Sequence, residues 1–353
     1  MKLRLVPLII LILSIMTLSG CRGQKANCEV AFITDGGTVE DAAYNEGCYT
    51  GLKRFCDEQG LKYKAYVPEY DVKEGYLLQI EQAAKDGAKV VICPSYMLEE
   101  AVYDAASAYP KINFILVDGM PHNADYSDTT IAENVLAITF AEEEAGFLAG
   151  YAAVRDGYER LGFLGGMAED SVIKYGYGFV QGADYAGIEL GQKVYIAYTY
   201  TGTFSEDQGV RDMAAIFYDY SVKAIMACGG EGGNSVMRAA EEKSGAVIGT
   251  DYDHEFESPA VVFSCVKNLD KAVYDALNDY HTGNFAGGTE KHLTCAEEGV
   301  LLTMDCGKFN SFSDIEYKAI YDELASKQIV PYGNTDIGTT AELNLVNTEI
   351  IYQ

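Results

Sequence analysis

Short apolar runs alternate with helix-like stretches along most of the chain, and this alternation limits the folds that the sequence allows. Strands are predicted at Val30–Ile33, at 89–93 and at Asn113–Val117, because each run is short, apolar and followed by polar or glycine residues. Between these runs, as over 44–55, apolar residues recur at helical spacing. Strands that alternate with helices form parallel sheets covered on both faces, so we expect an α/β fold.

The same alternation begins again in the second half of the chain. Strands are predicted between 160 and 249 in the order seen in the first half. Val91 corresponds to Ile225 at a spacing of 134 residues, and Asp118 corresponds to Asp251 at a spacing of 133. This spacing is far longer than that of a solenoid repeat. It predicts an internal duplication into two doubly wound parallel-sheet lobes.

The lobe boundaries follow from where the strand order restarts. We expect residues 28–136 and 256–290 to form the first lobe, and residues 137–255 and 291–353 to form the second. No proline- or serine-rich linker separates the halves, which favours a hinge of several crossing strands over a single tether. Two lobes joined in this way can close around a ligand.

The first residues have the composition of an export signal. Lys2 and Arg4 precede an apolar stretch over 5–18, which is short for a membrane span. The sequence Leu-Ser-Gly before Cys21 resembles a bacterial lipobox. We expect a signal peptide over 1–20, lipidation of Cys21 and a polar tether over 21–27, which places the protein on the extracytoplasmic face of the cell membrane. The alternative is a plain signal peptide followed by an incidental cysteine.

The charge of the chain is strongly negative. The formal net charge is −27, and removal of Lys2 and Arg4 leaves 24 basic against 53 acidic residues, or −29. A surface of this sign repels nucleic acids and anionic membranes and offers no basic stripe to bind either, so we expect no nucleic-acid partner. We expect a soluble monomer attached to the membrane through its lipid anchor.

Eight cysteines remain after Cys21, without any Cys-x-x-Cys pair, and the chain has four histidines without an HExxH motif. We therefore predict no metal and no cofactor. Cys295 and Cys306 flank a predicted hairpin and are the first candidates for a disulfide. Cys93 and Cys228 end apolar strands and are expected to be buried as small hydrophobic residues.

Polar, aromatic and glycine residues follow the predicted strands. In open α/β sheets, ligands bind outside the carboxyl ends of the strands. The residues expected to line an inter-lobe cleft are Asp35, Ser95, Tyr96, Asp118, Gly166, Phe204, Gly229, Gly230 and Asp251. Carboxylates that accept from hydroxyl groups and rings that stack suit a neutral, hydroxylated ligand with a flat ring.

Structural alternatives exist for several of these residues. The loop from Asp35 to Tyr44 is alternatively an ordinary surface turn, and Tyr44 alternatively belongs to the core face of its helix. Asp118 is alternatively the cap of a turn rather than a ligand contact. Lys267, after a predicted strand, is alternatively a solvated side chain. Whether Asp118 or Asp253 contacts the ligand stays open.

Several segments match the motifs of one protein family in combination. They are DAAYN at 41–45 with YTGLK at 49–53, FAEEEAGFLAGY at 140–151, GFLGGM at 162–167, GTFSE at 202–206, ACGGEGG at 227–233, IGTDYDH at 248–254 and SCVK at 264–267. Through these motifs the chain resembles the basic membrane protein family, the substrate-binding lipoproteins of ABC importers that include purine-nucleoside receptors. The resemblance implies a type I periplasmic-binding-protein fold over about the whole mature chain.

The resemblance also implies roles for individual residues. Tyr44 and Phe204, one from each lobe, would sandwich a purine-like base. Asp35 and Asn45 would bind the edge of the base, and Asp251 and Lys267 would hold ribose hydroxyls. Ser95, Tyr96 and Gly230, expected from their positions after predicted strands, would complete the site. The chain departs from the family motif where Tyr44 replaces phenylalanine, where Ala42-Ala43 replaces Lys-Ser and where His254 replaces glutamine. The exact base, and whether the ligand is a nucleoside or another ringed solute, therefore stay open.

The sequence thus predicts a lipid-anchored solute receptor that delivers a nucleoside-like ligand to an ABC permease, and not an enzyme. One alternative is a surface enzyme that processes nucleosides or sugars, for which Asp35 and Asp41 would be the acid–base candidates. The glycine-rich segment 229–233 lacks the Lys-Ser/Thr of a phosphate-binding loop. A further alternative is a signalling or adhesion module without a functional ligand site.

Overall fold

A computed structural model describes residues 27–40 and 44–353. The predicted signal peptide, the lipidation site Cys21 and nearly all of the tether lie outside the described residues. Within these two ranges, none of the helices has both the length and the apolar character needed to cross a membrane.

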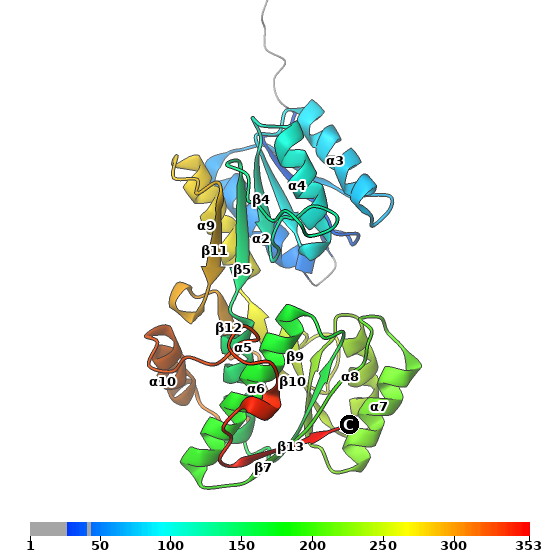
Figure 1. Ribbon diagram of the computed structural model, residues 1–353, viewed down its shortest axis with the longest axis vertical. Coiled ribbons are helices and arrows are strands. Elements are labelled where there is room, and N and C mark those ends of the chain that lie inside the picture. Colours follow the sequence, from blue (N-terminus) through cyan, green and yellow to red (C-terminus); the bar gives the residue numbers. More distant parts are fainter. Residues whose placement is uncertain (1–26, 41–43) are drawn as a thin grey trace, which may run out of the picture.

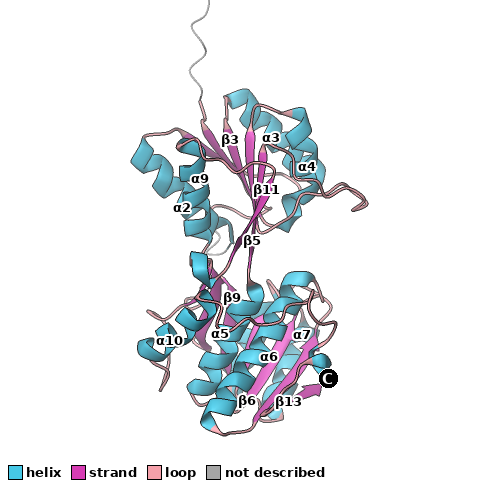
Figure 2. Ribbon diagram, turned by 60° about the vertical axis from the view of Figure 1, so that its left-hand side comes forward, coloured by secondary structure: helices cyan, strands magenta, loops and turns pink. Residues whose placement is uncertain are grey.

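The described chain forms two lobes, each a sheet between helices (Figures 1 and 2). The sheet of the first lobe has the strand order β11-β5-β4-β3-β1-β2, and all of its neighbouring strands are parallel. Its strands are β1 (Val30–Ile33), β2 (Tyr63–Tyr66), β3 (Val90–Pro94), β4 (Asn113–Val117), β5 (Val135–Phe140) and β11 (Thr289–Leu293). Its helices are α2 (Tyr44–Gln59), α3 (Lys73–Asp86), α4 (Glu99–Ala108) and α9 (Leu269–His281), with the short 3₁₀ helix η1 (Tyr96–Leu98).

The sheet of the second lobe has the order β12-β10-β9-β8-β6-β7-β13, parallel except for the pair β10–β12. Its strands are β6 (Arg160–Gly165), β7 (Val194–Tyr200), β8 (Ala224–Cys228), β9 (Ala246–Asp251), β10 (Val261–Lys267), β12 (Val300–Leu302) and β13 (Thr348–Tyr352). Its helices are α5 (Glu142–Arg155), α6 (Asp170–Leu190), α7 (Gln208–Asp219), α8 (Gly232–Lys243) and α10 (Asp314–Ala325), with η2 (Cys295–Glu297) and η3 (Thr340–Glu342). The α/β class predicted from the sequence is confirmed.

The central strands are apolar on both faces because helices cover both faces. Every residue of β3 and of β8 is buried. In the first lobe, residues of α3 and α4 pack with one face of the sheet, and residues of α2 and α9 belong to the cluster on the other face. Parallel strands buried in this way read as continuous apolar runs, which is why the sequence predicted them well.

The chain passes between the two sheets at Ala141, at Asn268 and at Thr294, between β5 and α5, β10 and α9, and β11 and η2. The predicted boundaries differ from these positions. We expected residues 256–290 in the first lobe, but β10 pairs with β9 and β12 in the second sheet. No helix separates β9 from β10, so the strand–helix alternation gave no signal there. β5 and β11 also extend the first sheet to Phe140 and Leu293, beyond the predicted ends at 136 and 290.

The C-terminal strand β13, which pairs in parallel with β7 at the edge of the second sheet, was not predicted from the sequence. The eight cysteines from Cys28 to Cys306 are all free thiols in the described chain, so the candidate disulfide between Cys295 and Cys306 is not formed. Cys295 is buried beside Glu144, whereas the thiol of Cys306 lies 3.1 Å from Asp253 Oδ2. The burial of Cys93 and Cys228 is confirmed.

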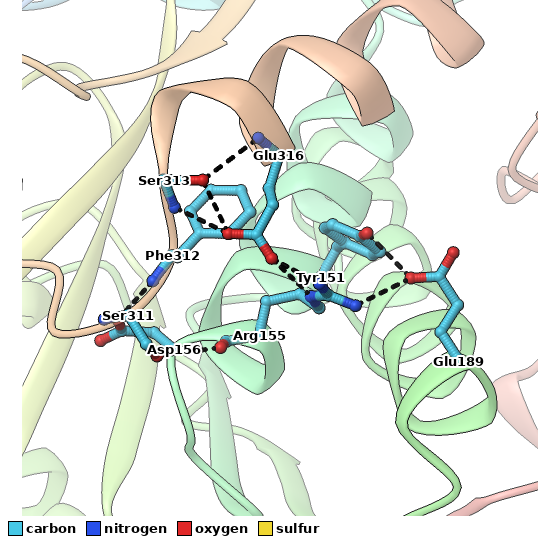
Figure 3. A network of polar contacts seen from close by, with 8 residues as sticks. All are labelled: Tyr151, Arg155, Asp156, Glu189, Ser311, Phe312, Ser313 and Glu316. Carbon is cyan, nitrogen blue, oxygen red and sulfur yellow. Dashed lines mark hydrogen bonds and ion pairs between the residues drawn. The ribbon is translucent and has the colours of Figure 1, made fainter.

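A polar network fixes α10 and the loop before it against the end of α5 (Figure 3). Arg155 donates to Glu316 and to Glu189, which lies on α6. One oxygen of Asp156, just after α5, accepts from the backbone N–H groups of residues 310–312. Ser313 and Glu316 form a capping box at the start of α10. The network therefore ties three segments of the second lobe to the helix that follows the β5 crossing.

Helices α5 and α6 cross at very close range because glycines line their contact. Gly146 and Gly150 on α5 face backbone atoms of α6, and Gly178 and Gly182 on α6 face backbone atoms of α5. A Cβ added at Gly150 would overlap the carbonyl oxygen of Phe179, which cannot move without shifting α6. The glycines thus permit the helix packing that supports the β5–α5 junction.

The substitution Gly150→Ala is expected to lower the free energy of unfolding by about 2 kcal/mol, because overpacking against backbone forces the helices apart. Gly233→Ala on α8 is the matched control, since an added Cβ meets no atom within 4 Å there. Its stability is expected to equal or exceed that of the wild type. Chemical denaturation measures both, and equal stability of the two variants would contradict the packing argument.

Candidate functional site

A buried lysine joins the two lobes through three carboxylates. Lys267 ends β10, and its side chain is 2% exposed. Its Nζ lies 2.7 Å from Asp118 Oδ2, 3.1 Å from Glu142 Oε1 and 3.1 Å from Asp251 Oδ1. Asp118 follows β4 of the first sheet, whereas Glu142 begins α5 and Asp251 ends β9 of the second lobe. We call these four residues the Lys267 cluster. Its ion pairs connect the lobes at the carboxyl ends of their strands.

Local backbone geometry helps to place two of the acids. Asp118 and Asp251 have φ angles of 61° and 68°, in the left-handed region that aspartate tolerates better than most residues. Each residue comes at the end of a buried strand, so the turn directs its carboxylate toward the junction between the sheets. The duplication predicted that the two aspartates occupy corresponding positions. In the structure they supply one carboxylate from each lobe.

The surroundings of the cluster partly balance its negative charge. The Tyr175 hydroxyl donates to Asp251 Oδ1 at 3.2 Å, and Lys174 Nζ lies 3.6 Å from Glu142 Oε2. Burial raises the pKa of Asp118, an effect that Lys267 opposes and that Glu142 and Asp251 reinforce. Burial lowers the pKa of Lys267, but the attraction of the three carboxylates outweighs it and holds this pKa above its ordinary value. Lys267 is therefore charged throughout the physiological range.

Tyr44, the first residue of α2, reaches this cluster. Burial, followed by the Asp118 carboxylate, raises the pKa of its hydroxyl well above the ordinary value. The hydroxyl is buried and makes no hydrogen bond to any residue in the described part of the chain. The ring also packs against the apolar core. The Tyr44 hydroxyl thus lies at the lobe junction and its ring packs against the core. Its contact with a ligand stays a prediction.

Asp35 and Asn45 form a second polar group at the end of β1. Asn45 Nδ2 donates to Asp35 Oδ1 at 2.6 Å, and the Asp35 N–H donates to Asn45 Oδ1 at 3.2 Å. The Tyr76 hydroxyl donates to the Asp35 carbonyl oxygen at 3.1 Å. Asn45 is buried. Paired side chains therefore tie the end of β1 to the start of α2.

Ser95 and Tyr96 follow β3 in the first lobe. Ser95 is buried with a φ of 73°, and its hydroxyl accepts from the Met97 N–H at 3.3 Å. The Tyr96 side chain is about half exposed. Burial raises the pKa of Tyr96, and Glu169 of the second lobe and Asp35 raise it further. Acidic residues of both lobes therefore lie close enough to Tyr96 to affect its pKa.

Phe204 lies in the second lobe, in the loop after β7. An added Cβ at Gly166 would overlap its ring, and one at Gly230 would lie 3.6 Å from its Cβ. The Phe204 carbonyl oxygen accepts from the Gly232 N–H at 2.9 Å. Glycines therefore make room for Phe204. No ring contact between Tyr44 and Phe204 exists within the described residues, so their facing arrangement stays a prediction.

Two of the structural alternatives are wrong. Lys267 is not a solvated lysine, and the Asp118 carboxylate pairs with Lys267 instead of capping a turn. Asp253 lies outside the Lys267 cluster, beside Cys306. Glu142 and Tyr175 were not predicted as members of the site. Glu142 lies in the family motif at 140–151, from which only the resemblance was drawn, whereas Tyr175 lies on α6 outside every motif.

Without Lys267, the three carboxylates of the cluster should repel one another. Lys267→Met is expected to lower the free energy of unfolding at neutral pH by about 3 kcal/mol, because it leaves buried carboxylates without a counter-charge. Without Lys267 the folded-state pKa of Asp118 rises further above its unfolded value. The loss is therefore present above that pKa and shrinks as the pH falls through it.

Denaturation of Lys267→Met and wild type at pH 7 and at about pH 4 tests this sign. Lys223→Met, at an exposed lysine without an ion pair in the described chain, is the control and should change stability by less than about 0.5 kcal/mol. A loss for Lys267→Met that grows toward acidic pH would contradict the charge argument.

Comparison with known proteins places the chain in a family. The family model for PnrA-like ABC transporter substrate-binding proteins, Bmp, matches residues 28–334. The ABC transporter nucleoside-binding protein BmpA of Lactococcus lactis is 26% identical over 348 residues, covering 90% of this chain and 95% of the relative. Basic membrane protein A of Borreliella burgdorferi is 28% identical over 331 residues, covering 91% and 92%.

The fold has counterparts among solved structures. A solute-binding protein of an ABC transporter system from Aeropyrum pernix superposes with a TM-score of 0.71 at 20% identity, covering 89% of this chain and 95% of that protein. A similar protein from Conexibacter woesei gives a TM-score of 0.68 at 20% identity, covering 87% and 99%. At this identity the likeness concerns the fold, and it confirms the expected periplasmic-binding-protein type. The match of the family model over most of the chain confirms the resemblance found in its motifs: the protein belongs to the Bmp family of PnrA-like ABC transporter substrate-binding proteins.

Proposed function

We propose that the protein is the lipid-anchored receptor of an ABC importer and that it binds a purine-type nucleoside between its two lobes. The family assigns it to the substrate-binding proteins of ABC transporters. The lactococcal relative, similar over nearly its whole length, is named a nucleoside-binding protein, which supports a nucleoside as the ligand. In this role the receptor has two partners, the nucleoside and a membrane permease.

The Lys267 cluster is the observation that carries the proposal. Asp118 and Asp251 offer acceptor oxygens and Lys267 offers donor hydrogens, within a buried group that draws on both lobes. A pair of neighbouring hydroxyls needs this combination of acceptors and donors. In the proposed complex the ribose hydroxyls bind here, and the Tyr44 hydroxyl, which lacks a hydrogen bond within the described chain, lies beside them.

We assign the purine-type base of the ligand to the residues around the Lys267 cluster. The rings of Tyr44 and Phe204 would stack on its two faces, and the Asp35–Asn45 pair would present an acceptor and an amide donor to its edge. Ser95, Tyr96 and Gly230 would complete the enclosure. Each lobe supplies only part of these contacts, so the full affinity is reached when the lobes close on the ligand.

Catalysis is not needed to explain the site. The curated relatives named above are substrate-binding or membrane proteins, and the acids of the Lys267 cluster are engaged with a lysine rather than aligned with a nucleophile. A receptor returns its nucleoside unchanged. Release of free base during incubation, detected by chromatography, would favour the alternative of a nucleoside-processing enzyme.

Titration calorimetry with inosine, guanosine and adenosine is expected to show binding. Tyr44→Ala and Phe204→Ala should each weaken it by about 1–3 kcal/mol, the typical contribution of a base stacked on an aromatic ring. Tyr220→Ala is the control, because Tyr220 is 76% exposed at the end of α7. Absence of heat and of thermal stabilisation with the whole nucleoside panel would reject this class of ligand. Unchanged affinity in both aromatic variants would reject the sandwich.

Lipidation is expected at Cys21. Mass spectrometry of protein from the membrane fraction should find an N-terminal peptide that begins at Cys21 and carries acyl chains, because several chains are needed for stable anchoring. Cys21→Ser should move the protein out of the membrane fraction without changing its ligand affinity. A mature chain that begins at another residue would contradict the anchor and leave the binding proposal intact.

A further inference from the structure

We propose that the end of the first lobe farthest from the Lys267 cluster docks on anionic phospholipid headgroups and thereby orients the anchored receptor on the membrane. The proposal rests on the lipid anchor proposed above. It concerns a hollow that is lined by lysines and is separate from the nucleoside site.

The hollow lies where α3 and α4 end and where β3 and β4 begin. Its volume is about 450 Å³, and its lining includes Lys85, Lys89 and Lys111 as basic residues and Glu81 as the acidic residue. Lys85 pairs with Glu81 at 2.6 Å. The side chains of Lys89 and Lys111 are exposed and form no ion pair or hydrogen bond with any residue of 27–40 or 44–353. The hollow thus carries an excess of positive charge.

Helix dipoles do not account for these lysines. Cations often neutralise the carbonyl groups at helix C-termini. Here the last turn of α3 is capped by the backbone N–H groups of Gly87 and Ala88. Asn134 Nδ2 lies within hydrogen-bonding distance of the Ala106, Tyr109 and Ile112 carbonyl oxygens at the end of α4. Several of these carbonyl groups therefore have other donors, and the ammonium groups of Lys89 and Lys111 are available to a partner.

Nearby acids are also engaged. Asp86 accepts from Lys64 at 2.7 Å, from the Tyr66 hydroxyl at 2.9 Å and from Gln82 at 3.1 Å. Glu29 accepts from the Lys62 N–H at 3.1 Å. The chain as a whole has a formal charge of −27, so two uncompensated lysines beside one hollow stand out from the general surface. Anionic membranes would repel most of this protein but not this end.

The start of the described chain places this end near the membrane. The N–H groups of Asn27 and Cys28 donate to the Asp86 carbonyl oxygen, next to the hollow. Six residue steps separate Cys21 from Asn27, and an extended chain covers at most about 3.5 Å per step. A lipid on Cys21 therefore holds Asn27 within roughly 20 Å of the headgroups. An electrostatic contact needs an approach of about 8 Å at physiological salt, which this tether permits.

Docking at the hollow leaves the nucleoside site accessible. Lys89 directly precedes β3 and Lys111 lies just before β4, whereas Ser95 and Asp118 follow the other ends of the same strands. A strand of five residues separates these ends by about 17 Å. The strands of the first lobe would then point away from the bilayer, with the second lobe beyond them (Figure 1).

Lysine acetylation measured by mass spectrometry tests the contact. Lipidated protein is reconstituted in vesicles of phosphatidylcholine alone or with added phosphatidylglycerol. Lys89 and Lys111 are expected to react roughly fivefold more slowly in the anionic vesicles, the factor that corresponds to the attraction of one lysine to an anionic surface. High salt should remove this protection, and the exposed Lys223 and Lys327 of the second lobe should react equally in both vesicles. Equal rates for Lys89 and Lys111 in both vesicles would overturn the proposal.

Unlipidated Cys21→Ser protein separates the hollow from the anchor. At low salt it should co-sediment weakly with anionic vesicles, and Lys89→Glu/Lys111→Glu should abolish this binding. Lys223→Glu/Lys327→Glu makes the same change in charge elsewhere and should retain it. If the two double variants bind the anionic vesicles equally, docking at the hollow is overturned, whether or not Cys21 is lipidated in the native protein. Protection of Lys89 and Lys111 by inorganic phosphate without vesicles, to the same extent, would reassign the hollow to a soluble anion and overturn docking on the membrane.

Discussion

The ammonium group of Lys267 lies among three carboxylates that come from both lobes, and the geometry of the lobe junction depends on it. A buried lysine is tolerated only when its charge is matched, and here Asp118, Glu142 and Asp251 match it at 2.7–3.1 Å. The same groups are those best suited to bind ligand hydroxyls. In the proposed complex, a ligand that binds these groups would replace contacts that the protein already makes, and this would couple solute binding to the relative position of the lobes.

The packing around the junction supports this coupling. Three chain crossings, at Ala141, Asn268 and Thr294, surround the cluster, and α5 begins with Glu142 immediately after the first of them. Close glycine contacts with α6 and the Arg155–Glu316 network hold α5 in the second lobe. We therefore expect a movement of the first lobe to be transmitted to the acids and the lysine rather than absorbed by a shift of α5. This is the arrangement expected of a hinge between rigid bodies.

Much of the candidate site could be predicted, but in separate pieces. The duplication located Asp118 and Asp251, the family motifs located Tyr44, Asn45, Phe204 and Lys267, and the structure brings several of these residues together. Glu142 was not predicted because its motif served only to establish the family resemblance. Tyr175 was not predicted because, in the sequence, a buried aromatic residue on a long helix looks like any other core residue. Only the hydrogen-bond partner of its hydroxyl distinguishes it. The boundary at β10 was missed because a parallel strand without an intervening helix interrupts the alternation on which the prediction relied.

By itself, the sequence determined the α/β class, the duplicated order of strands and helices, the polar residues at the strand ends and the family. These features depend on near neighbours in the chain, through hydrophobic period and turn-forming residues. The tertiary structure alone decided that Lys267 is buried beside an acid 149 residues away, and that the lysines before β3 and β4 share one hollow. Charge pairing of this kind depends on distances through space, which packing sets and local pattern does not encode.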